Sequence, residues 1–137
     1  MQLSNTYIAG YYAIYLNDLG NMEFVTPSYL VDVPELHNVK LWGYSPVYDP
    51  LYNKEVDIIY REDLQAWVPT KERSLIDEIR QQTIQDEFLC FAIEDYLDFE
   101  GTLDDLREVA KRHNMLEEFD AYYKYSLAFI EDHFNHM

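Results

Sequence analysis

The chain has 137 residues, of which 26 are acidic and 10 are basic, so its formal net charge at pH 7 is −16. A charge of this sign and size repels DNA, RNA and anionic membranes, which excludes the usual nucleic-acid-binding and membrane-surface classes. The hydrophobic content of 48% is typical of a folded protein rather than a disordered one.

The sequence also indicates a compartment. No apolar stretch approaches the roughly 20 residues that cross a bilayer, and the first residues lack the charged and apolar regions of a signal peptide. The single cysteine, Cys90, lies in an apolar run, which indicates a packing role under reducing conditions. We therefore expect a cytoplasmic protein that makes no membrane contact.

The first sixty residues are expected to form β-strands. Tyrosine and apolar residues alternate over residues 7–16, which predicts a strand, and a turn at 17–21 lets residues 22–26 pair back as a hairpin. Prolines separate the later candidates because proline interrupts a strand ladder. These later strands are expected at residues 29–33, 39–42 and 56–61.

Aromatic residues are unusually common. Thirteen tyrosines and seven phenylalanines exceed what a minimal core needs, and tyrosine is enriched at protein interfaces. The segment 43–50 combines tyrosines with two prolines and is predicted to be an aromatic surface loop. Tyr44 and Tyr48 are therefore candidates for contact with a partner protein.

Helical patterns begin after Pro69. Thr70 is a plausible N-cap for a helix that ends near residue 82. Thr102 is expected to cap a second helix, to about residue 113, with Asp105 close to a capping-box position. A final helix is expected over residues 116–134, and its apolar face comprises Phe119, Tyr122, Tyr123, Ser126, Leu127, Ile130 and Phe134.

The segment 87–98 is ambiguous on periodicity alone. Its apolar positions suit a helix, whereas its aromatic content suits a buried strand. The residues by themselves leave both alternatives open.

Acidic residues are concentrated between residues 86 and 120, where twelve acids stand against three bases. Duplex DNA carries one negative charge per about 1.7 Å of its axis, and a helical surface with several outward carboxylates per turn can approach that density. Such a surface fits the Lys/Arg-lined channel of a nucleic-acid enzyme. The expected contacting carboxylates are Asp86, Glu87, Glu94, Asp95, Asp98, Asp104, Asp105, Glu108, Glu117, Glu118 and Asp120.

Catalytic and metal-binding patterns are absent from the sequence. No pair of carboxylates stands out as acid and base, and Cys90 has no adjacent His or Lys that would lower its pKa. His133 and His136 have no evident third ligand for zinc, and no phosphate-cradling glycine loop is present. We expect a protein that is not an enzyme and uses neither a cofactor nor a metal.

Five short segments carry a resemblance to a known family. They are QAWVP at 65–69, SLIDEI at 74–79, DEF at 86–88, FAIEDY at 91–96 and TLDDLREVA at 102–110. Over residues 64–119 the chain resembles the ArdA-type antirestriction proteins, with which mobile elements block restriction enzymes by imitating DNA. In that family a segment similar to 91–96 forms a strand, so the resemblance implies a strand over residues 87–94.

Together these expectations give an α+β protein. An antiparallel, β-rich N-terminal half is followed by a C-terminal half in the order helix, strand, helix, helix. Residues 1–63 are expected to form a Tyr-rich β region, and residues 64–137 an acidic α/β region that resembles an ArdA module. The two regions are also compatible with one compact domain.

The resemblance and the charge imply a DNA-mimic inhibitor in the cytoplasm of a host cell. Its expected partner is a basic nucleic-acid-binding protein, either a restriction enzyme or a CRISPR effector, and it binds no nucleic acid directly. A second copy of the chain is a further candidate partner. Two alternatives remain open: an immunity protein that neutralises a basic nuclease toxin, and a non-enzymatic assembly protein that uses its tyrosine-rich surface.

Overall fold

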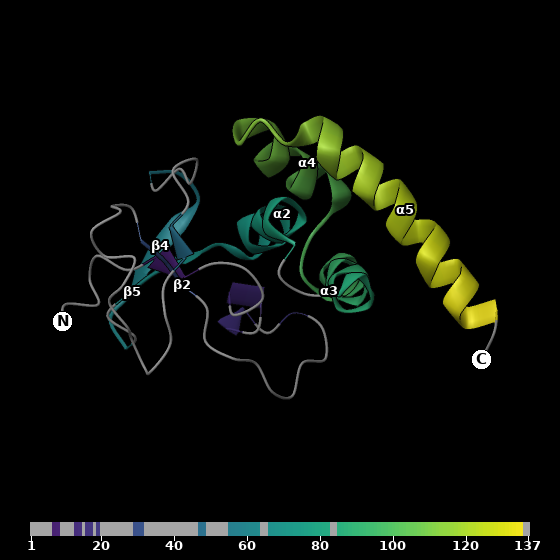
Figure 1. Ribbon diagram of the computed structural model, residues 1–137, viewed down its shortest axis with the longest axis horizontal. Helices are drawn as coiled ribbons and strands as arrows, with labels where there is room; N and C mark the ends of the chain where they lie inside the picture. The colour runs from purple at the N-terminus through teal and green to yellow at the C-terminus, as the bar shows by residue number, and fades with distance from the viewer. Residues whose placement is uncertain are drawn as a thin grey trace.

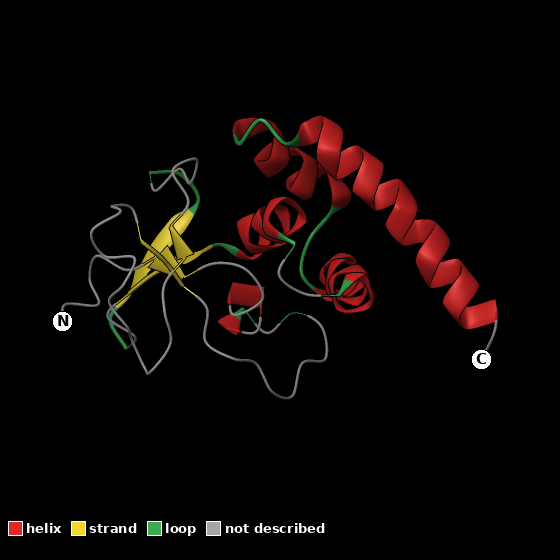
Figure 2. Cartoon of the chain, in the orientation of Figure 1, coloured by secondary structure: helices red, strands yellow, loops and turns green. Residues whose placement is uncertain are grey.

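The computed structural model describes residues 7–8, 13–14, 16–17, 19, 29–31, 47–48, 55–63, 66–82 and 85–135. Most of them belong to four helices, α2 to α5, and the remainder to short strands and turns. Strands and helices lie at opposite ends of the molecule, with α2 next to the sheet (Figures 1 and 2). The expected α+β fold is therefore wrong, because the described chain is mostly helical and its strands are short.

The best-formed part of the sheet is an antiparallel hairpin. It pairs β4 (Ile58–Arg61) with β5 (Ala66–Pro69), so that Ile58 faces Pro69 and Arg61 faces Ala66. The ring of Tyr60 meets that of Trp67 edge-on, with centroids 5.1 Å apart. A cross-strand aromatic pair of this kind stabilises a hairpin.

Three shorter strands extend the hairpin in the order β3-β2-β1-β5-β4. They are β1 (Tyr7–Ile8), β2 (Tyr29–Val31) and β3 (Val47–Tyr48). Strand β1 pairs in parallel with β5 and antiparallel with β2, and β3 pairs in parallel with β2. The N-terminal sheet is therefore mixed rather than antiparallel.

The long strand expected over residues 7–16 is wrong at residues 13, 14 and 16. Ala13, Ile14 and Leu16 are helical, and Ala13 and Ile14 are both fully buried. A strand would have placed these two neighbours on opposite faces, whereas a helical turn against the core buries both. The strands expected at 22–26 and 39–42 lie outside the described residues.

Two of the predicted helices are confirmed with their caps. Helix α2 (Lys71–Gln81) begins at Thr70, whose hydroxyl accepts the backbone N–H of Arg73 at 3.3 Å. Helix α4 (Leu103–Arg112) begins with a full capping box, since Thr102 and Asp105 each donate a backbone N–H to the other's side chain at 3.1 Å. Both helices start where the local sequence predicts.

The final helix, α5 (Leu116–Asn135), is confirmed, although its expected apolar face is wrong in part. Phe119 and Ser126 are buried as expected, but the side chain of Leu127 is 54% exposed. The C-terminal turns of α5 extend beyond the other helices (Figure 1). In the part of the chain that the structure describes, no helix is both long and apolar enough to cross a membrane.

The segment between α2 and α4 is a helix, α3 (Asp86–Phe99), and not the strand that the resemblance implied. Leu89, Ala92, Ile93 and Tyr96 repeat at helical spacing and are all buried. Because burying this one face stabilises a helix, the segment is helical despite the β-propensity of its aromatic residues.

One hydrophobic core joins both ends of the chain. Helix α2 contacts the other three helices and strand β5, so it lies at the centre of the packing. Ile76, Ile93 and Phe119 belong to a buried cluster that also contains Ile14 and Leu19, from the segment before the hairpin. Burying each such side chain stabilises the fold by about 1.5–3 kcal/mol.

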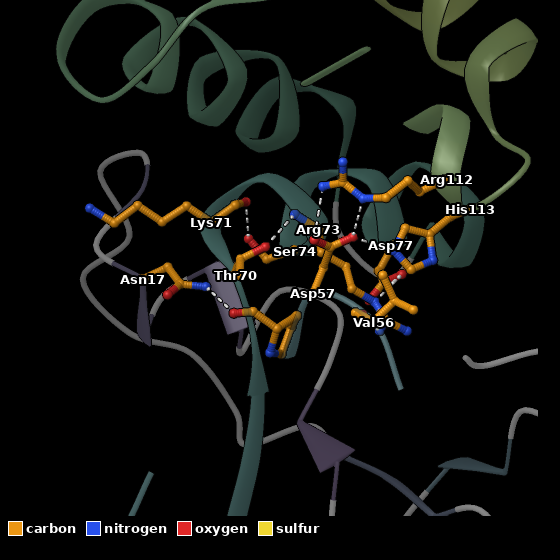
Figure 3. A network of polar contacts seen from close by, with 11 residues as sticks. Asn17, Val56, Asp57, Thr70, Lys71, Arg73, Ser74, Asp77, Arg112 and His113 are labelled. Carbon is orange, nitrogen blue, oxygen red and sulfur yellow. Dashed lines mark hydrogen bonds and ion pairs between the residues drawn. The ribbon is translucent and has the colours of Figure 1, made fainter. Parts of the chain in front are cut away.

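Three nitrogen-bearing side chains fasten the sheet to the helices (Figure 3). The guanidinium of Arg73 on α2 donates to the carbonyl of Val56, while Arg112 and His113 at the end of α4 both hydrogen-bond the carboxylate of Asp57. The backbone of Asp57 has a φ of 61°, in the left-handed region. These contacts set the orientation of β4 relative to α2 and α4.

Candidate functional site

The carboxylates expected to contact a partner lie on α3, α4 and α5. Nine of the eleven are exposed, and Glu94 and Asp95 are half-buried. The set therefore reaches solvent from three different helices, and its members differ in what they do within the fold.

Several of these carboxylates have partners within the chain, and three of the contacts are as follows. Asp120 accepts two hydrogen bonds from Arg107 at 2.9 and 3.0 Å. These hydrogen bonds are the main reason why the pKa of Asp120 lies below its usual value. Asp105 completes the capping box of α4. Asp86 accepts hydrogen bonds from two tyrosines of α5, Tyr122 and Tyr125.

Six members of the set lie in the first turn of a helix. An acid there is stabilised by the positive end of the helix dipole, by about 0.3–1 kcal/mol. Helix stability alone therefore explains why acids occupy these positions. The six are Asp86, Glu87, Asp104, Asp105, Glu117 and Glu118.

Glu94 and Asp98 are placed differently, because they lie in the C-terminal half of α3. The helix has no basic residue in its last turn, so the negative end of its dipole is not compensated there. The two acids are also four residues apart, a like-charge spacing that destabilises a helix by about 0.2–0.5 kcal/mol. Burial and the charge of Asp98 together raise the pKa of Glu94. These two acids oppose the stability of their own helix.

Glu87 joins these two residues in a row along one side of α3. With about 100° between successive residues, Glu87, Glu94 and Asp98 fall within about 40° of one another, and the row is about 16 Å long. In the part of the chain that the structure describes, none of the three makes a hydrogen bond or an ion pair. We call these three residues the α3 acidic row.

The density of the α3 acidic row can be compared with that of DNA. Its charges are about 8 Å apart on average along the helix axis, whereas those of one DNA strand are 3.4 Å apart. The row is therefore equivalent to a sparse stretch of a single strand. Phe99, which is 79% exposed, lies beside the end of this row.

Of the two tyrosines expected in a surface loop, Tyr48 belongs to the described residues. Tyr44 lies outside the described residues. Tyr48 belongs to β3, where it pairs with Val31, so this part of the segment is a strand and not a loop.

The sequence does not predict that aromatic side chains of α3 and α5 come together, although Tyr122 is expected on the apolar face of the final helix. Tyr122, Tyr125, Phe129 and His133 follow one side of α5, and Phe91 of α3 meets the last two edge-on. Their spacing of three or four residues was the available signal. This aromatic ladder is partly exposed, since Tyr125 is 45% accessible.

Two features of the described residues bear on metal binding and on cysteine chemistry. No group of three or more His, Cys, Asp or Glu side chains among them is placed to hold a metal ion. Cys90 is fully buried, and this burial raises the pKa of its thiol. A thiol in this environment is a packing residue rather than a nucleophile.

Comparisons with known proteins find no matching family model, no matching curated protein and no matching solved structure. The likeness to the ArdA-type proteins therefore depends on the quoted residues alone, and its strongest segment, 91–96, is helical here.

Proposed function

We propose that the protein is a non-enzymatic inhibitor that enters the nucleic-acid channel of a DNA- or RNA-handling enzyme with the acidic side of α3. One observation carries this proposal: Glu94 and Asp98 lie where they destabilise their own helix. Acids that oppose folding at a solvent-facing site are expected where a cationic partner compensates for them.

The size of individual charge effects requires several contacts. A single exposed ion pair contributes about 1 kcal/mol or less, so one carboxylate cannot hold a partner. The three charges of the α3 acidic row add to one another, and the net charge of −16 accelerates encounter with a cationic surface. The resemblance to ArdA-type proteins points to a host defence enzyme, either a restriction enzyme or a CRISPR effector.

The test is displacement of DNA from candidate targets. A fluorescent duplex is bound to each of a panel of restriction enzymes and CRISPR effectors, and its anisotropy is followed as the protein is added. We expect the duplex to be released from at least one enzyme, and the release to weaken steeply with salt because screening shortens to about 3 Å at 1 M.

A matched pair of triple variants separates the α3 acidic row from total charge. Glu87→Gln/Glu94→Gln/Asp98→Asn is expected to lose displacement. Glu62→Gln/Glu131→Gln/Asp132→Asn removes the same charges from other exposed positions and is expected to keep most of it. Equal loss in both variants, or displacement that persists at 1 M salt, would show that the row is not the contact surface.

A further inference from the structure

A separate pocket lies where the start of α3 meets the middle of α5. It has a volume of about 480 Å³ and is lined by Gln82, Gln85, Asp86, Tyr122 and Tyr125. Gln82 ends α2 and Gln85 precedes α3, so the pocket draws on three helices. Among the described residues that line it, the one charged group is the carboxylate of Asp86, which favours a cation as the ligand.

The carboxylate of Asp86 is held in a fixed orientation. The phenol of Tyr122 donates to its Oδ1 at 3.0 Å, and the phenol of Tyr125 donates to its Oδ2 at 3.4 Å. An ionised carboxylate has about four lone-pair sites, so each oxygen can still accept a further hydrogen bond. Asp86 is thus oriented by the protein and retains capacity for a ligand.

The two phenols are themselves positioned by packing. The ring centroids of Tyr122 and Tyr125 lie 5.6 Å apart, and the Tyr122 hydroxyl is 3.8 Å from the buried Cys90 sulfur. Burial is the first cause that raises the pKa of Tyr122, so this phenol remains a hydrogen-bond donor at neutral pH. The pocket is therefore preorganised, which limits the entropy lost on binding.

The combination of an oriented carboxylate and aromatic rings selects one kind of cation. A guanidinium presents parallel N–H donors to both oxygens of a carboxylate, and its flat face stacks on aromatic rings. An ammonium group has neither the fork nor the flat face. We infer that this pocket binds an arginine side chain of the partner protein.

The surface beside the pocket has room for the chain that carries this arginine. A second hollow of about 600 Å³ continues along α5 and shares Gln82 and Tyr122 with the pocket. Ile79, Met115 and Ala121 give it an apolar part, and Arg80 and Glu118 add one charge of each sign to its lining. The identity of the partner rests on the proposed function, because nucleic-acid enzymes present arginines in their channels.

The test titrates the full-length, ¹⁵N-labelled protein with N-acetyl-L-arginine amide and follows its backbone amide resonances. Saturable shifts are expected around Asp86 and along α5 from Tyr122 to Tyr125. N-acetyl-L-citrulline amide, which has the same shape without the charge, is expected to leave these resonances unchanged. N-acetyl-L-lysine amide is expected to bind about tenfold more weakly than the arginine compound, because it lacks the second charge-assisted hydrogen bond.

Two variants test the carboxylate. Asp86→Asn is expected to weaken arginine binding about tenfold, whereas Glu131→Gln, an equal charge change at an exposed position of α5, is expected to leave it unchanged. Tyr125→Phe removes one of the two orienting hydrogen bonds and is expected to weaken binding more modestly, which keeps the test informative if Asp86→Asn does not fold.

Three outcomes would overturn the inference: shifts that do not saturate, equal shifts with citrulline, or equal affinity for lysine. Because no target enzyme is present, these outcomes leave the inhibitor proposal standing. Conversely, a failed displacement assay leaves an observed arginine site intact.

Discussion

The guanidinium of Arg112 holds both oxygens of the Asp57 carboxylate, at 3.1 Å from Nε to Oδ2 and 2.9 Å from Nη2 to Oδ1. The two residues are 55 positions apart in the chain, so the contact joins α4 to the first residues of the hairpin. The left-handed φ of Asp57 adds a second requirement, since among side chains Asn and Asp tolerate it best. Position 57 therefore combines a backbone constraint with a charge constraint.

Replacing Asp57 separates these two constraints. Asp57→Asn keeps the left-handed backbone and removes the charge, so we expect a loss of about 1–2 kcal/mol in the free energy of unfolding. Urea denaturation followed by circular dichroism measures it. The control is Asp63→Asn, which breaks an exposed pair with Arg61 and should change stability by less than about 0.5 kcal/mol. Equal effects from both variants would contradict the role of Asp57.

Stability should also depend on pH through this cluster. Burial alone would raise the pKa of Asp57, but the hydrogen bonds from Arg112 and His113 outweigh it, and the pKa lies below its ordinary value of 3.8. The ionised Asp57 therefore contributes to the free energy of unfolding above pH 3.8, and this contribution is lost as the pH falls through the lowered pKa of the folded state. Burial holds the pKa of His113 below its ordinary 6.5, so the unfolded chain takes up that proton first and acidification below pH 6.5 favours unfolding.

The variant His113→Gln isolates the upper part of this dependence. Gln can donate to Asp57 but does not titrate, so the decline in stability just below pH 6.5 should disappear, while the decline near the pKa of Asp57 remains. Denaturation midpoints of variant and parent are measured at a series of pH values. Because both proteins contain the same other acids, the difference between their midpoints cancels the pH dependence that those acids cause. If the stability difference between variant and parent were the same at every pH, His113 would not cause the decline below pH 6.5.

The acids at the end of α3 should lower stability in the free protein. Asp98→Asn removes the like charge next to Glu94, and we expect a gain of about 0.2–0.5 kcal/mol. Because the pKa of Glu94 is raised, its unfavourable effect is absent below its ordinary value of 4.5 and appears as the pH rises through the folded-state pKa. The gain should therefore be larger at pH 7 than at pH 4. A loss of stability at pH 7 would mean that Asp98 has a structural role instead.

The capping box of α4 gives a local test of the fold. Thr102→Ala removes the side-chain acceptor of the Asp105 N–H and should cost about 1 kcal/mol. Thr102→Ser keeps the hydroxyl and should cost much less. The two variants are compared by thermal melting, and similar losses in both would place the effect in the methyl group rather than in the hydrogen bond.

The sequence predicted those features that depend on neighbouring residues. Thr70 and Thr102 each accept a hydrogen bond from an N–H three residues ahead, so their caps follow from local chemistry. Over helix α3 the resemblance implies a strand, whereas the helical spacing of the apolar residues agrees with the structure. The Asp57–Arg112 ion pair joins residues 55 positions apart, and the Asp86–Tyr122 hydrogen bond of the pocket joins residues 36 positions apart. No local pattern predicts which distant residues meet.

The central place of β1 in the sheet has a consequence for the order in which the chain folds. Tyr7 pairs with Trp67, so β1 lacks one of its two neighbouring strands until the chain has grown by about sixty further residues. At synthesis rates of 5–20 residues per second, this delay is roughly 3–12 s. During that time the nascent tyrosine-rich segment is without its final partner, and an emerging chain in this state is a candidate substrate for ribosome-associated chaperones.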